Sequence, residues 1–421
     1  MIRRRMLWTA AAVAAGAWWL RPGDRGGPPD ERLAALARAL GDVPQQPVLV
    51  LDRARWRANL ARIRRLAHAA LPLRVVAKSL PCAPLLDEAL RAWNTQRAMV
   101  FNARQAELVA QARPDADLLL GKPLPASAAH GVLPRLARAR LDAPRQVQWL
   151  VDTPERLAEY RALARAQGVP LGINIEIDVG LHRGGVESME ALAAMLDLLR
   201  DEPLLPLRGF MGYDAHLASI PDLPGNRERA LTHARERYTA SVGLARERLH
   251  TEGHDWTLNT AGSPTLHLHD DRHTPNELAV GSAAVKPSHF DLPSLAELEP
   301  ALFIATPILK VMERFRLPVG AEAISDALRW WDVNQRQGLA IHGGHWLADP
   351  VHPQGVASSG LYGPSSNQQV MVASPSTPLA VGDWMLWRPW QSEAVMTQFD
   401  TLCVVDDGKL QAQWPVMPVN P

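Results

Sequence analysis

Short apolar runs alternate with helical periodicity through the first two thirds of the chain. Residues 47–52 (PVLVLD) form a continuous apolar run of strand length, and residues 53–70 carry apolar side chains at helical spacing. The same alternation continues to about residue 263. It predicts eight strands, at 47–52, 74–79, 97–102, 115–121, 146–152, 171–180, 207–216 and 256–263. Helices are expected between most of them, including 84–93, 154–167 and 226–250.

Eight strands that alternate with helices are typical of a (β/α)8 barrel, the TIM-type α/β fold. We expect this barrel over residues 45–292. Beyond about residue 293 the helical periodicity fades, and short apolar stretches are separated by Gly, Pro and Ser. This change predicts a β-rich C-terminal domain over residues 293–421. The helix-breaking segment 291–300 (DLPSLAELEP) is the expected joint.

The first 29 residues differ from the rest of the chain. Three arginines at 3–5 precede an apolar run from Met6 to Leu20, and a polar stretch rich in Pro and Gly follows. This order is typical of an export signal, and the paired arginines resemble the twin-arginine type. We therefore expect residues 1–29 to be a signal peptide or an N-terminal membrane anchor of an exported, periplasmic protein. A basic tail on a cytoplasmic protein is the alternative.

Charge and cysteine content exclude several classes of protein. The 421 residues carry 45 Lys+Arg against 44 Asp+Glu, a formal net charge of +1. No basic stripe beyond the N-terminus indicates nucleic-acid binding. The two cysteines, Cys82 and Cys403, are too few for a CxxC metal cluster or a disulfide framework. We expect two buried free thiols, with a single bridge between them as the alternative.

Polar residues gather where the predicted barrel strands end, which is where (β/α)8 barrels place their functional groups. They are Lys78, Asn102, Asp178, Tyr213, His216 and the pair Gly262–Ser263. Lys78 follows an apolar run, and an ammonium group is costly to bury unless it is paired or neutralised. It is therefore either a strand-end lysine that reaches solvent or a partly desolvated amine nucleophile.

Four of these segments together resemble the fold-type III enzymes that use pyridoxal 5′-phosphate (PLP). The segments are RVVAKSLP (74–81), NIEIDVGLHRGGV (174–186), GFMGYDAH (209–216) and LNTAGSPT (258–265). The set is most similar to the D-threonine aldolase and D-serine dehydratase-like branch, whose barrel is of the alanine racemase type. The resemblance covers roughly residues 45–421 and depends on the combination, because each segment alone is unspecific.

The resemblance implies roles around the cofactor ring. Lys78 would form the Schiff base with PLP, which requires an unprotonated amine and accounts for a lysine at a buried strand end. Arg183 and Tyr213 would lie near the ring. Tyr213 or His216 would act as a second acid/base across the substrate Cα from Lys78. The alternatives are a loop ion pair for Arg183 and a packed strand-end aromatic for Tyr213.

The resemblance also implies a phosphate site made by two segments. AGSPT (261–265) would cradle the phosphate, because small residues let backbone N–H groups approach an anion. NELAVGS (276–282) would lie beside it. The residues concerned are Gly262, Ser263, Thr265, Gly281 and Ser282. Without the resemblance, 261–265 is an ordinary turn.

The chain departs from the family where relatives that act on hydroxy amino acids hold a divalent metal. Their His-x-Cys or His-x-Asp pair aligns with Gln391 and Glu393. Glutamine is a weak ligand and no thiolate is present, so we expect no zinc site here. Glu393 alone could hold weakly bound magnesium or manganese. The histidine-containing segment 340–353 (AIHGGHWLADPVHP) is a second, weaker metal candidate.

The resemblance therefore implies a PLP-dependent lyase, of aldolase or dehydratase type, that acts on a small amino acid or 3-hydroxy amino acid of D configuration. A metal normally polarises the substrate hydroxyl, so the changed ligands raise racemisation as one alternative. A non-catalytic PLP-binding regulatory protein is another. The family implies a monomer or homodimer.

Overall fold

The computed structural model describes residues 21–41, 43–221 and 223–418, so residues 1–20 of the expected signal or anchor at 1–29 lie outside the described residues. The described chain divides into two compact units. We call residues 53–301, 391–402 and 414–418 the barrel unit, and residues 21–52, 302–390 and 403–413 the sheet unit. The predicted boundaries, 45–292 and 293–421, are therefore too simple, because the chain passes between the two units several times.

The barrel unit contains a closed barrel of eight parallel strands, which confirms the predicted fold class. The strands are β2 (Leu73–Val76), β3 (Arg97–Val100), β4 (Asp117–Leu120), β5 (Val147–Val151), β6 (Gly172–Glu176), β7 (Leu207–Gly212), β8 (Thr257–Thr260) and β9 (Glu277–Val280). Barrel closure pairs β9 with β2, with Leu278 opposite Leu73. Most strand residues are buried, as expected for parallel strands covered by helices.

The first predicted strand is not part of this barrel. Strand β1 (Val48–Asp52) pairs antiparallel with β10 (Leu302–Met312) in the sheet unit, with Val50 opposite Phe303. The eighth barrel strand is instead β9, which the sequence analysis placed only beside the phosphate. A short apolar run predicts a strand but not the partner with which that strand pairs.

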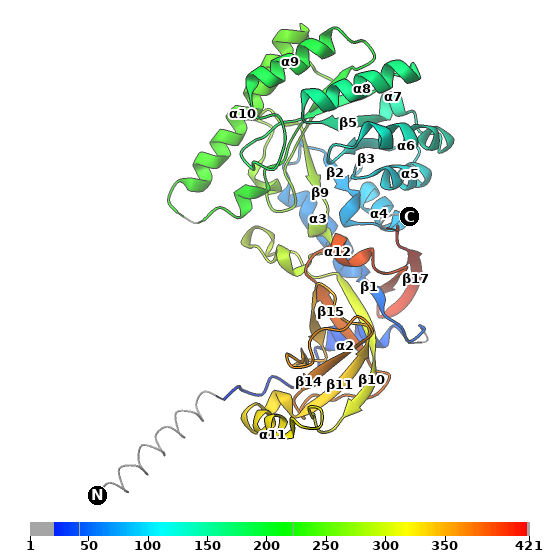
Figure 1. Ribbon diagram of the computed structural model, residues 1–421, viewed down its shortest axis with the longest axis vertical. Helices are drawn as coiled ribbons and strands as arrows, with labels where there is room; N and C mark the ends of the chain where they lie inside the picture. The colour runs from blue at the N-terminus through cyan, green and yellow to red at the C-terminus, as the bar shows by residue number, and fades with distance from the viewer. Residues whose placement is uncertain (1–20, 42, 222, 419–421) are drawn as a thin grey trace, which may run out of the picture. The chain divides into compact units, whose positions relative to one another are not determined.

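Helices cover the outside of the barrel (Figure 1). They are α3 (Arg53–Leu66), α4 (Ala83–Ala92), α5 (Ala103–Ala112), α6 (Ala126–Arg138), α7 (Ala143–Gln146), α8 (Pro154–Gln167), α9 (Met189–Arg200) and α10 (Asn226–Leu249). Helix α8 shows why the sequence predicts such bounds well. Thr153 caps its first turn by accepting from the Arg156 N–H, and Gly168 ends it in the left-handed conformation at φ 63°.

Shorter helical segments of the barrel unit follow several strands. They are the 3-10 helices η1 (Ala77–Ser79), η2 (Ala215–Ala218), η3 (Leu266–Leu268), η4 (Ser282–Ala284), η5 (Ser288–Phe290) and η6 (Pro293–Leu295), and the α-helix α12 (Ser392–Met396). Predicted site residues lie in η1, η2 and η4, so these short turns orient part of the site.

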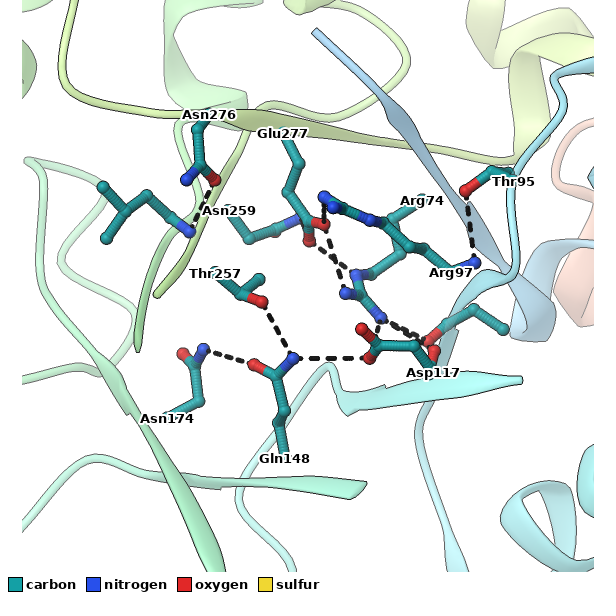
Figure 2. Close-up of polar contacts among 12 residues, drawn as sticks. Arg74, Thr95, Arg97, Asp117, Gln148, Asn174, Thr257, Asn259, Asn276 and Glu277 are labelled. Carbon is teal, nitrogen blue, oxygen red and sulfur yellow. Dashed lines mark hydrogen bonds and ion pairs between the residues drawn. The ribbon is translucent and has the colours of Figure 1, made fainter. Parts of the chain in front are cut away.

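A polar network crosses the interior of the barrel (Figure 2). Arg74 is fully buried and donates through Nε to Glu277 Oε1 at 2.5 Å, and through Nη1 to Asp117 Oδ1 at 3.1 Å. Arg97 Nη1 lies 2.7 Å from Glu277 Oε2, and Asn259 Nδ2 donates to Glu277 Oε1 at 2.8 Å. The buried carboxylate of Glu277 is thus neutralised and hydrogen-bonded, which a charge in this position requires.

The sheet unit is β-rich, as the C-terminal composition predicts. Its strands besides β1 and β10 are β11 (Gln337–His342), β12 (Ala348–His352), β13 (Ala357–Ser358), β14 (Gln368–Ala373), β15 (Trp384–Pro389), β16 (Thr401–Asp406) and β17 (Lys409–Pro415). The order is β13-β14-β11-β10-β1-β16-β17, and β15 pairs with both β10 and β12. Two helices, α2 (Glu31–Arg38) and α11 (Glu322–Trp331), and the 3-10 helix η7 (Val333–Gln335) belong to this unit.

Candidate active site

A cavity lies at the mouth of the barrel, beyond the C-terminal ends of its strands. The structure brings most of the predicted site residues to the wall of this cavity: Lys78, Arg183, Tyr213, Gly262, Ser263, Gly281 and Ser282. Glu393, from α12, also lines it. Residues separated by hundreds of positions therefore meet at one site, where (β/α)8 barrels carry their chemistry.

Lys78 lies in η1, directly after β2. Its side chain is 40% exposed, so the amine is partly desolvated. Nζ lies 4.6 Å from the centre of the Phe101 ring and 3.7 Å from Glu393 Oε1. The amine thus has one apolar neighbour and one acidic neighbour inside the cavity.

Glu393 is held by serine hydroxyls. Ser392 Oγ lies 3.2 Å from Glu393 Oε2, and Ser282 Oγ lies 3.3 Å from the same oxygen. Ser282 Oγ also lies 2.8 Å from Ser79 Oγ. Because the hydroxyls contact Oε2, the second oxygen, Oε1, is the one that faces Lys78. From the sequence, Glu393 is expected only as a weak metal ligand, and its approach to the lysine is not predicted.

Two glycines shape part of the cavity wall. A Cβ atom on Gly281 would lie 2.8 Å from Val76 Cβ, and one on Gly262 would lie 2.8 Å from Tyr213 Cε2. Only glycine therefore allows this packing. Ser263 Oγ accepts from the N–H groups of Gly281 at 3.3 Å and Ala283 at 3.2 Å, which leaves the Ser263 hydroxyl proton to donate elsewhere.

Thr265 is not at the wall of the cavity. It is fully buried, and its hydroxyl donates to Asp214 Oδ1 at 2.7 Å while accepting from the Gly262 N–H at 3.1 Å. The other Asp214 oxygen lies 2.7 Å from His269 Nε2. Thr265 therefore fixes the 261–265 loop from behind. Asp214 and His269 were not predicted, although Asp214 directly follows Tyr213 in the segment that carries the resemblance.

Tyr213 and Arg183 lie against each other. The Arg183 guanidinium carbon is 4.9 Å from the centre of the Tyr213 ring. Burial raises the pKa of the Tyr213 hydroxyl, and the nearby Arg183 charge opposes this only in part. Tyr213 is therefore protonated at neutral pH and can act as a proton donor. The Asp178 carboxylate contacts His182 Nδ1 at 2.6 Å.

His216 lies in η2, behind the cavity wall. Among the described residues, its buried Nδ1 atom has no hydrogen-bond partner. Burial lowers the pKa of the His216 imidazole, which favours the neutral ring. Of the two residues considered as second acid/base, Tyr213 is the one that faces the cavity.

The metal candidates are not gathered into a cluster. Gln391 Nε2 lies 3.5 Å from His289 Nδ1, and Gln391 occupies the position before α12. Within the described part of the chain, no group of three or more His, Cys, Asp and Glu side chains is placed to hold a metal ion. The expectation of no zinc site at Gln391 and Glu393 stays a prediction.

The fold and the position of this cavity define a (β/α)8-barrel protein whose site lies at the C-terminal mouth of the barrel. The chain belongs to the family described as "Alanine racemase, N-terminal domain", which matches residues 51–288. This is a family of PLP-dependent enzymes.

Individual relatives agree with this assignment. The chain is 25% identical over 279 residues to a 3-hydroxy-D-aspartate aldolase of Paracoccus denitrificans, an alignment that covers 63% of this chain and 65% of that protein. The structure is similar to D-threonine aldolase from Filomicrobium marinum, with a TM-score of 0.67, 19% identity and coverage of 89% and 95% of the two chains. It is also similar to D-threo-3-hydroxyaspartate dehydratase from Delftia sp. HT23, with a TM-score of 0.65, 20% identity and coverage of 89% and 98%.

The residues at the cavity wall fit PLP. Lys78 offers a primary amine for an aldehyde, and Ser263 and Ser282 offer hydroxyl groups for a phosphate. Phe101 offers an aromatic ring beside the amine, and Tyr213 offers a second ring at the cavity wall. The close packing of Gly281 against Val76 and Ser79 keeps the segment that carries Ser282 beside the segment that carries Lys78.

Proposed function

We propose that the protein is a PLP-dependent lyase that cleaves small 3-hydroxy amino acids of D configuration. The observation that carries this proposal is the position of Glu393 in the same cavity as Lys78, with Oε1 at 3.7 Å from Nζ. The names of two relatives, a 3-hydroxy-D-aspartate aldolase and a D-threonine aldolase, support both the reaction class and the substrate class.

Lys78 would hold the cofactor through Nζ, and the hydroxyl groups of Ser263 and Ser282 would hold the phosphate. When bound, PLP would serve as an electron sink for the Cα of the amino acid. The protein would supply the orientation of the substrate and the proton transfers.

Glu393 would supply the base for cleavage. Its Oε1 would accept the proton of the substrate 3-hydroxyl group, while the Ser392 hydroxyl group holds Oε2. Loss of that proton lets the Cα–Cβ bond break, so that the hydroxyl carbon leaves as an aldehyde. Tyr213, which keeps its proton because burial raises its pKa, would return a proton to Cα. In this proposal the Glu393 carboxylate activates the substrate hydroxyl group, which a metal ion polarises in relatives.

Racemisation is a second candidate, and one observation favours it. Lys78 and Tyr213 both line the cavity, and exchange of a Cα proton between two faces needs two acid/base groups. The 3-hydroxyl group takes no part in racemisation, so that reaction would give no role to Glu393 as a base.

The test is a screen of D- and L-amino acids on the wild type and on Lys78→Ala, with and without EDTA. We expect glycine and an aldehyde from D-3-hydroxy amino acids, with the same rate in EDTA. We expect Lys78→Ala to lose both the cofactor absorbance and all turnover. A 2-oxo acid with ammonia would indicate a dehydratase, and inversion without cleavage a racemase. PLP absorbance without any turnover would indicate a regulatory protein.

A further inference from the structure

Helix α11 of the sheet unit buries two polar side chains and turns apolar side chains to solvent. Ser325 and Arg329 are 2% and 9% exposed, whereas Ile324 and Trp330 are 54% and 64% exposed. This is the reverse of the arrangement in which an amphipathic helix buries its apolar stripe in the core. An apolar helix face in water indicates a contact surface.

The apolar positions form one continuous stripe. At about 100° per residue, they occupy an arc of roughly 120° on one side of the helix, and the polar positions occupy the opposite side. The stripe consists of Ala323, Ile324, Ala327, Trp330 and Trp331, and we call it the α11 face. Trp331 is half-buried and the other four are exposed.

Hydrogen bonds of the polar side fix this orientation. The Arg329 guanidinium donates to the Phe315 carbonyl and to Asp326, and the Ser325 hydroxyl donates to the Glu322 carbonyl at 2.9 Å. Arg336 Nε donates to the Arg329 carbonyl at 3.2 Å. Rotating α11 to bury its apolar face would break these hydrogen bonds. The bonds therefore hold the α11 face toward solvent.

Neighbouring segments extend the apolar surface. Val319, in the loop that leads into α11, is almost fully exposed, and so in large part are Leu361 and Tyr362. Tyr362 packs edge-on against Phe315, with ring centres 6.0 Å apart, and its hydroxyl donates to the Arg316 carbonyl at 3.2 Å. The sheet unit thus exposes further apolar side chains besides those of the α11 face.

The N-terminal part of the chain reaches this same place. The Arg21 guanidinium carbon lies 4.1 Å from the centre of the Trp330 ring, and Arg21 also donates to the Trp330 carbonyl. Asn334, just after α11, donates to the Gly23 carbonyl at 2.8 Å and accepts from the Arg25 N–H at 2.8 Å. Figure 1 shows this segment beside α11. In the sequence, the apolar run Met6–Leu20 directly precedes this segment.

We propose that the α11 face rests on the surface of a lipid bilayer. Exposed tryptophans next to apolar side chains are typical of the membrane–water interface, and amphipathic helices bind there through their apolar face. A run of about 15 apolar residues is short for a bilayer span, so a second contact would strengthen attachment. No helix among the described residues is itself long and apolar enough to cross a membrane.

Charges around the face have both signs. Arg21 and Arg314 are balanced by Glu322 and Asp326, and Arg314 Nη2 donates to Asp326 Oδ1 at 2.9 Å. Membrane binding of the α11 face is therefore driven mainly by insertion of apolar side chains and not by attraction to anionic lipid. Binding should accordingly depend little on ionic strength.

The experiment places an environment-sensitive fluorophore on the face in the full-length protein. Ile324→Cys is labelled, and Val381→Cys is the matched control, because Val381 is an exposed apolar residue elsewhere in the sheet unit. The two native thiols, Cys82 and Cys403, are buried, so labelling is selective. The probe membrane is a vesicle of phosphatidylcholine with phosphatidylglycerol, with one batch carrying a lipid-bound quencher.

We expect vesicles to shift the emission of the label at 324 to shorter wavelength, at low and high salt, and the lipid-bound quencher to reduce it, with no change at 381. Ile324→Ser combined with Trp330→Ser should lower vesicle flotation several-fold, and Val381→Ser should not. A protein that does not float, or that floats with an unchanged label at 324, would overturn the proposal. So would a label that is already blue-shifted without vesicles, which would show that the run 6–20 or a second copy covers the face.

Discussion

Glu393 Oε1 lies 3.7 Å from Lys78 Nζ, although the two residues are far apart in the sequence. Both side chains are about one third to two fifths exposed, and an ion pair in such a setting contributes only about 0–1 kcal/mol to folding. Stability therefore gives little reason for the pair. A carboxylate beside an amine in a barrel-mouth cavity has a chemical reason, since one group can bind a carbonyl compound and the other can move a proton.

Glu393→Gln should separate proton transfer from cofactor binding. The amide keeps the shape and the contacts with Ser392 and Ser282 but cannot accept a proton. We expect kcat for cleavage of a D-3-hydroxy amino acid to fall about 10²–10⁴-fold, the usual contribution of a general base. PLP absorbance and PLP affinity should stay close to those of the wild type, as measured by spectrophotometric titration.

The matched control is Glu190→Gln, at the exposed first turn of α9, which should leave the rate unchanged. Gln391→Ala is a second control, because a metal site at Gln391 and Glu393 would make both residues necessary. A normal rate in Glu393→Gln would refute the assignment of the base. Equal losses in Gln391→Ala and Glu393→Gln, restored by added Mn²⁺, would favour a metal.

The barrel fold was predictable because apolar runs, helical periodicity and helix-capping residues all indicate the same order of strands and helices. Apolar runs and helical periodicity give the alternation of a barrel, and caps such as Thr153 and Gly168 give helix ends. The pairing of short strands was not predictable, because a short apolar run indicates a strand but not its partner. For that reason β1 was assigned to the barrel and β9 was not.

The site was predictable only where a residue belongs to a motif. Lys78, Tyr213 and Ser263 follow barrel strands and lie in segments that carry the family resemblance. Glu393 comes from a segment after the sheet strands, and no local pattern shows that α12 returns to the barrel unit. Thr265 lies in the predicted loop, but its hydroxyl contacts Asp214 and does not line the cavity. A sequence does not show which way a hydroxyl points.

Thr265→Val should weaken the phosphate loop without altering its shape. The variant removes the donor to the buried Asp214 carboxylate and the acceptor of the Gly262 N–H. An unsatisfied buried polar group costs about 1–3 kcal/mol, so the free energy of unfolding of the protein without PLP should fall by about that amount. PLP affinity should fall as well. Urea unfolding and PLP titration measure the two effects.

Thr251→Val is the control for Thr265→Val, since Thr251 is exposed and should tolerate the change. Unchanged stability in Thr265→Val would mean that the loop does not depend on the Asp214 bond.

Arg74→Met should show that the barrel network is needed for stability. Arg74 is fully buried and is the bidentate partner of Glu277, so its loss leaves a buried carboxylate with reduced compensation. Breaking one side of a buried ion pair costs about 3–5 kcal/mol. Arg97→Met, at a side chain that is partly exposed, should cost less. If the two variants had equal midpoints in urea, burial of Arg74 would not be the deciding factor.

Glu176→Gln should make stability less dependent on pH. Burial, and then the nearby Asp152 and Asp178 charges, raise the pKa of Glu176 from 4.5 to about 7, against a lowering effect of Arg183. Between these two values the folded protein binds more protons at Glu176 than the unfolded chain does. Wild-type stability therefore falls as pH rises through this window, and the loss is complete above it.

At a pH above 7 the Glu176→Gln variant should be more stable than the wild type by up to about 3 kcal/mol, since one pKa unit corresponds to about 1.4 kcal/mol. Below 4.5 the two proteins should be alike, because glutamine resembles protonated glutamate. Urea unfolding at both pH values measures this difference, and other titrating groups cancel in it. Glu187→Gln, at an exposed position, should show no such trend. A difference of the same size at both pH values would mean that packing, rather than the charge of Glu176, distinguishes the variant from the wild type.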